Sequence, residues 1–121
     1  MRAIAIALVV LALGDAACAE SQPVCRSLEQ CDAAIRTAPS LAAYERRGYL
    51  HLVQRRGLDD LQKAIADFSA AIGIDAGRAF SLYGRGMARL MAGDAAGQNE
   101  MEAAIMLQRD IAEEFKRYGA E

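Results

Sequence analysis

The stretch YERRGYLHLVQRRGLDDLQKAIADFSAAIGI, residues 44–74, decides the fold, because both of its ends are repeated elsewhere in the chain. The opening YERRG (44–48) returns as LYGRG (82–86). The closing FSAAI (68–72) returns as MEAAI (101–105), and CDAAI precedes both at 31–35. The three Ala-Ile pairs therefore lie 37 and then 33 residues apart. A period of about 34 residues is typical of arrays of helix pairs, so the sequence predicts a helical repeat protein.

Apolar residues recur at three- and four-residue steps along the chain, which is the pattern of helices with one buried face. We expect helices over residues 27–37, 40–56, 58–74, 78–92, 97–108 and 109–118. Pro39 and the Gly93-Asp94 pair mark turns between them, and Gly97 weakens the start of the fifth helix. No segment alternates apolar and polar residues over any length, so we expect no strands. The predicted fold class is all-α.

These motifs resemble those of the tetratricopeptide repeat (TPR) family, whose repeat is about 34 residues long. The resemblance implies a short right-handed superhelix of antiparallel helix hairpins, with about two full repeats between capping helices. It divides the chain into a half repeat or cap at 20–39, repeats at 40–76 and 77–109, and a C-terminal capping helix at 110–121. Two repeats alone would leave an apolar flank at each end, and we expect the helices that begin at Ser27 and Asp110 to cover those flanks.

The resemblance assigns packing roles to a few positions. Small residues are expected where helices cross closely, and Phe68 is expected to fill the space between layers. These structural positions are Gly48, Ala64, Phe68, Ala71, Gly86 and Ala104. The chain also departs from the family pattern: the turn at 54–60 is longer than usual, alanine and arginine stand at 76 and 109 in place of proline, and Gly97 stands in place of alanine.

The first nineteen residues read as a secretory signal peptide, residues 1–19. Arg2 supplies the positive start, residues 3–13 are uninterruptedly apolar, and Ala17-Cys18-Ala19 offers small residues for cleavage after Ala19. Eleven apolar residues span only about 16 Å as a helix, against a bilayer core of about 30 Å. We therefore expect export, to the periplasm if the source is bacterial. An uncleaved membrane anchor is the alternative, and a lipoprotein signal at Cys18 is disfavoured by Asp15.

Cleavage would leave two cysteines, Cys25 and Cys31, and an even count in an exported chain indicates a disulfide. Two residues six apart in one helix are separated by about 9 Å along its axis, too far for the bond. Ser27-x-x-Gln30 reads as a capping box, which places Cys25 before the helix and makes the bond possible. Two free thiols, or a bond to another chain, are the alternatives.

Nothing in the sequence points to catalysis or to a cofactor. No metal-ligand cluster, phosphate-binding glycine loop or nucleophile motif is present, so we expect neither enzyme activity nor a bound metal. His51, the one histidine, has no partner implied by spacing and is expected to be either packed or exposed at the edge of its helix, and not catalytic. Arg47 and Arg85 are expected to pair with nearby carboxylates, Arg47 with Asp67. The net charge of −2 also argues against nucleic-acid binding.

Binding of a partner is the remaining function class. In the resembled family the first helix of each pair lines a concave groove, and aromatic and Met residues beside arginine suit a partner peptide or helix. Carried onto this chain, the groove residues are Glu45, Arg46, Tyr49, Phe80, Tyr83, Met87 and Met91. Phe80, Met87 and Met91 fit the helix–helix core equally well at these spacings. We expect an exported, non-enzymatic module that binds an as yet unidentified protein, with no membrane contact after signal cleavage. The alternative is a self-associating, homo-oligomeric envelope protein.

Overall fold

The structure is a computed structural model that describes residues 24–120. Over this range the chain forms helices joined by short turns and loops. The expected signal peptide, residues 1–19, lies outside the described residues. Within 24–120 there is no strand, which confirms the predicted all-α class. The helices are α2 (Leu28–Thr37), α3 (Leu41–Val53), α4 (Leu58–Ile74), α5 (Ala79–Met91), α6 (Ala96–Leu107) and α7 (Ile111–Tyr118).

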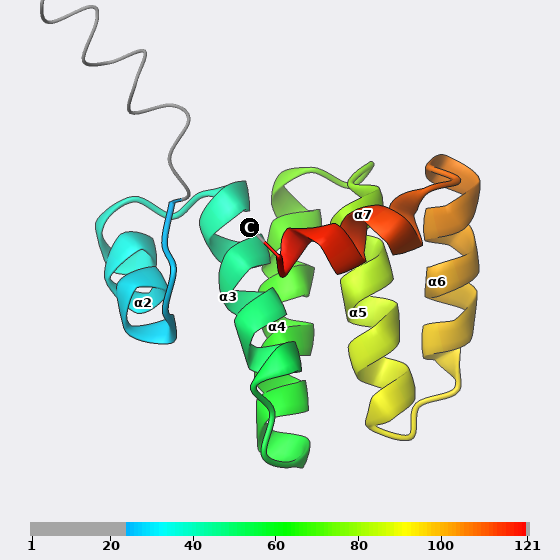
Figure 1. Ribbon diagram of the computed structural model, residues 1–121, viewed down its shortest axis with the longest axis horizontal. Helices are drawn as coiled ribbons and strands as arrows, with labels where there is room; N and C mark the ends of the chain where they lie inside the picture. The colour runs from blue at the N-terminus through cyan, green and yellow to red at the C-terminus, as the bar shows by residue number, and fades with distance from the viewer. Residues whose placement is uncertain (1–23, 121) are drawn as a thin grey trace, which may run out of the picture.

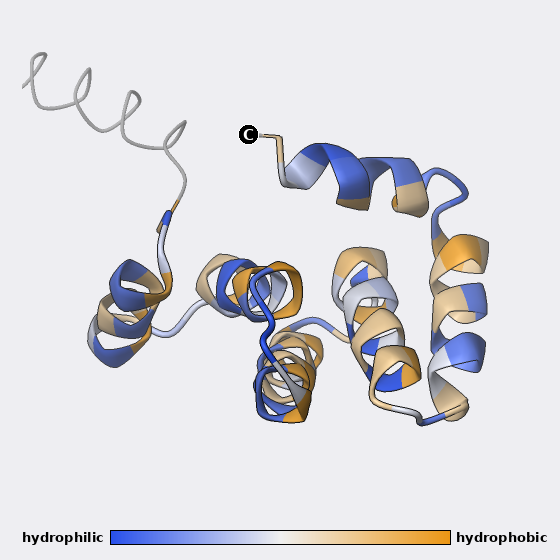
Figure 2. Cartoon of the chain, turned by 60° about the horizontal axis from the view of Figure 1, so that its bottom comes forward, coloured by the Kyte–Doolittle hydropathy of each residue, from blue (hydrophilic) through white to orange (hydrophobic). Residues whose placement is uncertain are grey.

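Helices α2 to α6 stand side by side in chain order, and α7 runs back from α6 across α5 towards α3 (Figure 1). The closest packing is within two pairs, α3 with α4 and α5 with α6, and α4 also packs on α5. In addition α3 contacts α5, so the first helices of the two hairpins are neighbours. We call the surface that they share, around Tyr49, Phe80 and Tyr83, the α3–α5 face. Figure 2 shows α7 lying over this face.

Local side-chain bonds define where the first two helices begin. The Ser27 hydroxyl accepts a hydrogen bond from the Gln30 amide at 3.1 Å, and the Gln30 side chain accepts one from the Arg26 amide at 2.9 Å. Ser27 is thus the N-cap, as predicted, but Gln30 accepts from the amide one residue before the N-cap and not from the Ser27 amide that a capping box uses. Ser40 caps α3 in the same way, by accepting from the Ala43 amide at 3.1 Å. Both caps satisfy backbone donors that have no partner within the helix.

Small residues allow the helices to touch. A Cβ added at Gly86 would lie 2.6 Å from the carbonyl oxygen of Gly97, so α5 and α6 meet backbone to backbone. Ala71 and Ala104 are fully buried at equivalent places in α4 and α6. Ala34, the third member of the series, is only partly buried, because α2 packs on α3 alone among the described helices.

The last helix does not cover the flank of the stack as the sequence analysis expects. Ile111 and Phe115 of α7 are buried in the main core cluster. Phe115 contacts the three aromatic rings of the α3–α5 face and also Phe68 of α4. The outer side of α6 is left open: Ile105, Met106 and Leu107 expose 42%, 88% and 58% of their surface. On the α3–α5 face α7 packs against aromatic rings, which add favourable ring–ring contacts to the burial of apolar surface. The sequence of α6 contains no aromatic residue that could offer such a contact.

Candidate partner-binding face

Three of the seven predicted groove residues form one aromatic cluster with α7. The Tyr49 ring centroid lies 5.3 Å from that of Phe115 and 4.9 Å from that of Tyr118. The Phe80 ring lies 4.8 Å from Phe115 and 4.6 Å from Tyr118. Tyr83 lies 5.3 Å from Phe115. The rings that the sequence suggests for a partner are thus in contact with a helix of the chain itself.

Glu45 lies beneath this face and is only 4% exposed. Its carboxylate accepts hydrogen bonds from Arg78 Nε and Nη2 at 2.8 and 3.0 Å, and from the Ser81 hydroxyl at 2.7 Å. The hydrogen bonds from Arg78 and Ser81 satisfy the buried charge and tie α3 to α5. Glu45 therefore supports the α3–α5 face and does not offer its carboxylate to a partner. Arg78 and Ser81 are not among the predicted site residues, and the repeat spacing that places α3 beside α5 is the sequence signal that points to them.

The other predicted groove residues are spread around the face. Arg46 lies at its edge, where its Nε donates to the Cys25 carbonyl at 3.2 Å and its guanidinium carbon stands 5.0 Å from the centre of the Tyr118 ring. Met87 is partly buried and packs against the hydrophobic core. Met91 is 46% exposed and lines a separate depression of about 360 Å³, together with Leu58 and Leu61. The structure does not bring Met91 together with the aromatic cluster.

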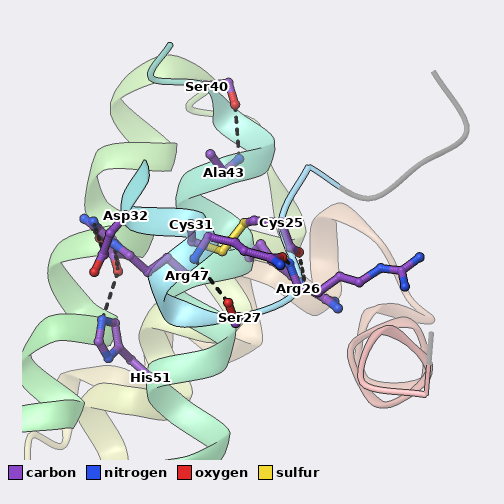
Figure 3. The surroundings of a disulfide bond; sticks show 12 residues. Cys25, Arg26, Ser27, Cys31, Asp32, Ser40, Ala43, Arg47 and His51 are labelled. Carbon is purple, nitrogen blue, oxygen red and sulfur yellow. Dashed lines mark hydrogen bonds and ion pairs between the residues drawn. A yellow bond between two sulfur atoms is a disulfide. The ribbon is translucent and has the colours of Figure 1, made fainter. Parts of the chain in front are cut away.

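A second group of polar residues connects α2, α3 and α4 (Figure 3). Arg47 donates to both carboxylate oxygens of Asp67, with the shortest contact 2.7 Å, and to Asp32 at 3.0 Å. This confirms the predicted Arg47–Asp67 pair. Hydrogen bonding to Asp67 raises the pKa of Arg47 above its ordinary value, so the guanidinium stays charged.

The second repeat contains the equivalent ion pair. Arg85 Nε donates to Glu100 at 2.8 Å, and Glu100 stands 33 residues after Asp67, one repeat further along. Burial lowers the pKa of Arg85 relative to its ordinary value. Arg89 also pairs with Glu100. Both repeats therefore hold their two helices together by an arginine on the first helix and an acid on the second.

His51 lies beside the Arg47–Asp67 pair in a depression of about 320 Å³. Its Nε2 stands 3.8 Å from a carboxylate oxygen of Asp67, and its Nδ1 is buried without a hydrogen-bond partner. Burial lowers the pKa of His51 below its ordinary value, and the attraction of Asp67 opposes this only in part. The imidazole is thus a packed side chain that disfavours protonation.

The disulfide between Cys25 and Cys31 forms as the sequence predicts, with the α-carbons 5.1 Å apart (Figure 3). Cys25 lies before the Ser27 cap and Cys31 in the first turns of α2, so the bond folds the preceding chain onto the helix. Both cysteines are buried against Leu50 of α3. The bond therefore anchors the N-terminal edge of the stack.

Within residues 24–120, no group of three or more His, Cys, Asp or Glu side chains is placed to hold a metal ion. In the same range, no helix is long and apolar enough to cross a bilayer. No protein-family model, curated protein or solved structure matches the chain.

Proposed function

We propose that this chain is a non-enzymatic, TPR-like protein-interaction module whose α3–α5 face binds a helix or peptide of a partner protein. The observation that carries the proposal is the seating of α7 on that face. Tyr49, Phe80 and Tyr83 together contact the rings of an amphipathic helix. Laying an amphipathic helix into an apolar groove is a common mode of peptide recognition, and aromatic residues are enriched where such contacts contribute most to affinity.

The TPR-like part of the proposal is supported by the equivalence of the two hairpins. Gly48 and Gly86 both stand where an added Cβ would crowd the paired helix, at 3.2 Å from Asp67 and 2.6 Å from Gly97. The Arg47–Asp67 and Arg85–Glu100 pairs then occupy matching places. A copied hairpin, stacked beside itself, makes a continuous core and a continuous face.

We also propose that the protein acts outside the cytoplasm, in the periplasm if the source is bacterial. The Cys25–Cys31 disulfide supports this location, because such bonds persist in oxidising compartments. The expected signal peptide agrees with it.

The test is an affinity capture from cell-envelope extract with the oxidised chain and its Tyr49→Ala variant as baits. We expect the native chain to retain a partner that Tyr49→Ala recovers less, because Tyr49 is partly exposed whereas Phe80 and Tyr83 are buried. Leu58→Ala is the matched control, since Leu58 is exposed and lies near Met91, outside the aromatic cluster. Circular dichroism would verify that both variants are folded. Equal recovery by the native chain and Tyr49→Ala contradicts the assignment of the face.

A second candidate function, self-association, is favoured by the open side of α6. Ile105, Met106 and Leu107 form an exposed apolar run where a further hairpin of a repeat array would stack. Sedimentation equilibrium of the native chain and of Met106→Glu tests it. A native oligomer that Met106→Glu dissociates supports this function, whereas a monomer at all concentrations excludes it.

A further inference from the structure

The last helix, α7, has the sequence pattern of a groove ligand. Its apolar residues Ile111, Phe115 and Tyr118 follow one another at steps of four and three, which places them on one side of a helix. Ile111 is fully buried and Phe115 is 5% exposed, whereas Lys116 and Arg117 are exposed. The helix thus presents an apolar stripe to the α3–α5 face and a charged side to water.

Charges at the edge of the face complement α7. The guanidinium of Arg46 stands over the ring of Tyr118 at 5.0 Å from its centre. Arg78, the N-cap residue of α5, is bound by Glu45 and lies in the negative field of Glu114 on α7. A helix on this face is therefore recognised by apolar side chains along one stripe, with a tyrosine at the end of the stripe that meets Arg46.

Little besides this contact holds α7 in place. It has eight residues, and helices much shorter than about 12 residues are marginal alone in water. Only residues 108–110 connect it to α6, and its packing on α6 is slight compared with that between α5 and α6. The helix therefore depends on the α3–α5 face for its order, while the apolar side of α6 next to the connection stays uncovered.

We propose that α7 is an internal ligand of the α3–α5 face, and that the external partner is an amphipathic helix of the same pattern which binds by displacing it. The partner would carry apolar side chains at positions i, i+4 and i+7, aromatic at the last two. This inference rests on the proposed function and specifies both the partner class and its regulation. A tethered helix competes at a high effective concentration, so the native chain binds its partner more weakly than the bare face would.

The probe is a fluorescent peptide of residues 109–120, kept helical by a lactam between Glu113 and the lysine of an Arg117→Lys substitution, both on the exposed side. Its binding to the oxidised full chain is measured by fluorescence anisotropy. We compare the native chain with Phe115→Ala/Tyr118→Ala, which weakens the internal helix. Glu113→Ala/Lys116→Ala is the matched control, because both of its changes are on the exposed side of α7.

We expect the Phe115→Ala/Tyr118→Ala chain to bind the peptide at least about tenfold more tightly than the native chain and the control. A peptide with alanine in place of Phe115 and Tyr118 is expected not to bind. The proposal is overturned if the weakened chain binds no better than the native chain, or if the alanine peptide binds equally well.

A measurement on the native chain removes any dependence on how well the variants fold. With isotope-labelled chain and unlabelled peptide in excess, amide-exchange NMR should show that α7 loses protection while α4 and α5 keep theirs. Unchanged protection of α7 with peptide bound overturns displacement. Capture of a partner that depends on Tyr49, together with unchanged α7 protection, would leave the proposed function standing and reject only this inference.

Discussion

The ring of Phe68 lies directly against the backbone of Gly84, and this contact joins α4 to α5. A Cβ added at Gly84 would stand 2.5 Å from Cζ of Phe68, closer than such atoms approach in proteins. Phe68 is fully buried and forms part of the main core cluster. The crossing between the two hairpins is therefore fitted to a glycine at this position.

Gly84→Ala should destabilise the fold by about 1–3 kcal/mol, because the added methyl group displaces a ring that is packed on all sides. Gly73→Ala is the matched control: Gly73 lies near the end of α4, and nothing stands within 4 Å of an added Cβ. There the higher helix propensity of alanine should stabilise by about 0.5–1 kcal/mol. Urea denaturation monitored by circular dichroism compares the two. Equal effects of the two substitutions would show that Phe68 can move away.

Asp67→Asn should cost about 2–4 kcal/mol of unfolding free energy, since Arg47 would then lose the charge that pairs with it in a buried place. Asp59→Asn serves as the control, because Asp59 is 93% exposed and meets Lys63 only at 3.9 Å. We expect that change to alter stability by less than about 0.5 kcal/mol. The same denaturation experiment measures both. A small loss at Asp67 would mean that Asp32 alone keeps Arg47 in place.

Stability should fall on acidification from pH 7 to pH 5, in part through His51. Burial lowers the pKa of His51 in the folded chain, so the unfolded chain binds its proton first, at about pH 6.5. The contribution of His51 to the free energy of unfolding is complete above the pKa that His51 has in the unfolded chain. It is lost as the pH falls through the lower pKa of the folded chain. His51→Gln should flatten this part of the pH profile of the unfolding free energy. An unchanged slope in His51→Gln would assign the acid sensitivity to other groups.

Reduction of the disulfide should lower the free energy of unfolding by about 2 kcal/mol. The loss is modest because the bond closes only a short loop of the unfolded chain. The loss should be concentrated at α2, since both cysteines pack only against the α2–α3 edge. Denaturation with and without a phosphine reductant tests the magnitude, and hydrogen exchange locates the change. Cys25→Ser/Cys31→Ser is the control and should not respond to reductant.

The sequence is sufficient to predict the helices, the N-cap at Ser27 and the Cys25–Cys31 bond. Each of these depends on residues near one another in the chain, where periodicity and helix geometry leave few choices. The Arg47–Asp67 pair was also predicted, because the repeat pattern places α3 against α4. Interactions within a hairpin are thus well determined by local sequence.

The placement of α7 and of Glu45 could not be predicted in the same way. The apolar stripe of α7 indicates that one side is buried, but not whether the helix covers α6 or the α3–α5 face. Glu45 reads as an exposed charge until Arg78 and Ser81, 33 and 36 residues later, are brought beside it. Both outcomes depend on contacts between hairpins, which a pattern within one helix does not record.

The course of α7 also limits how this protein can change in length. Tandem duplication of a hairpin unit at the C-terminal end would insert two helices between α6 and the present last helix. The last helix would then begin too far from α3 and α5 to reach Tyr49 and Phe80, and the α3–α5 face would lose its contact with α7. Duplication of a hairpin at this end would therefore remove α7 from the α3–α5 face. A hairpin added before α3 would leave the packing of α7 on α5 intact.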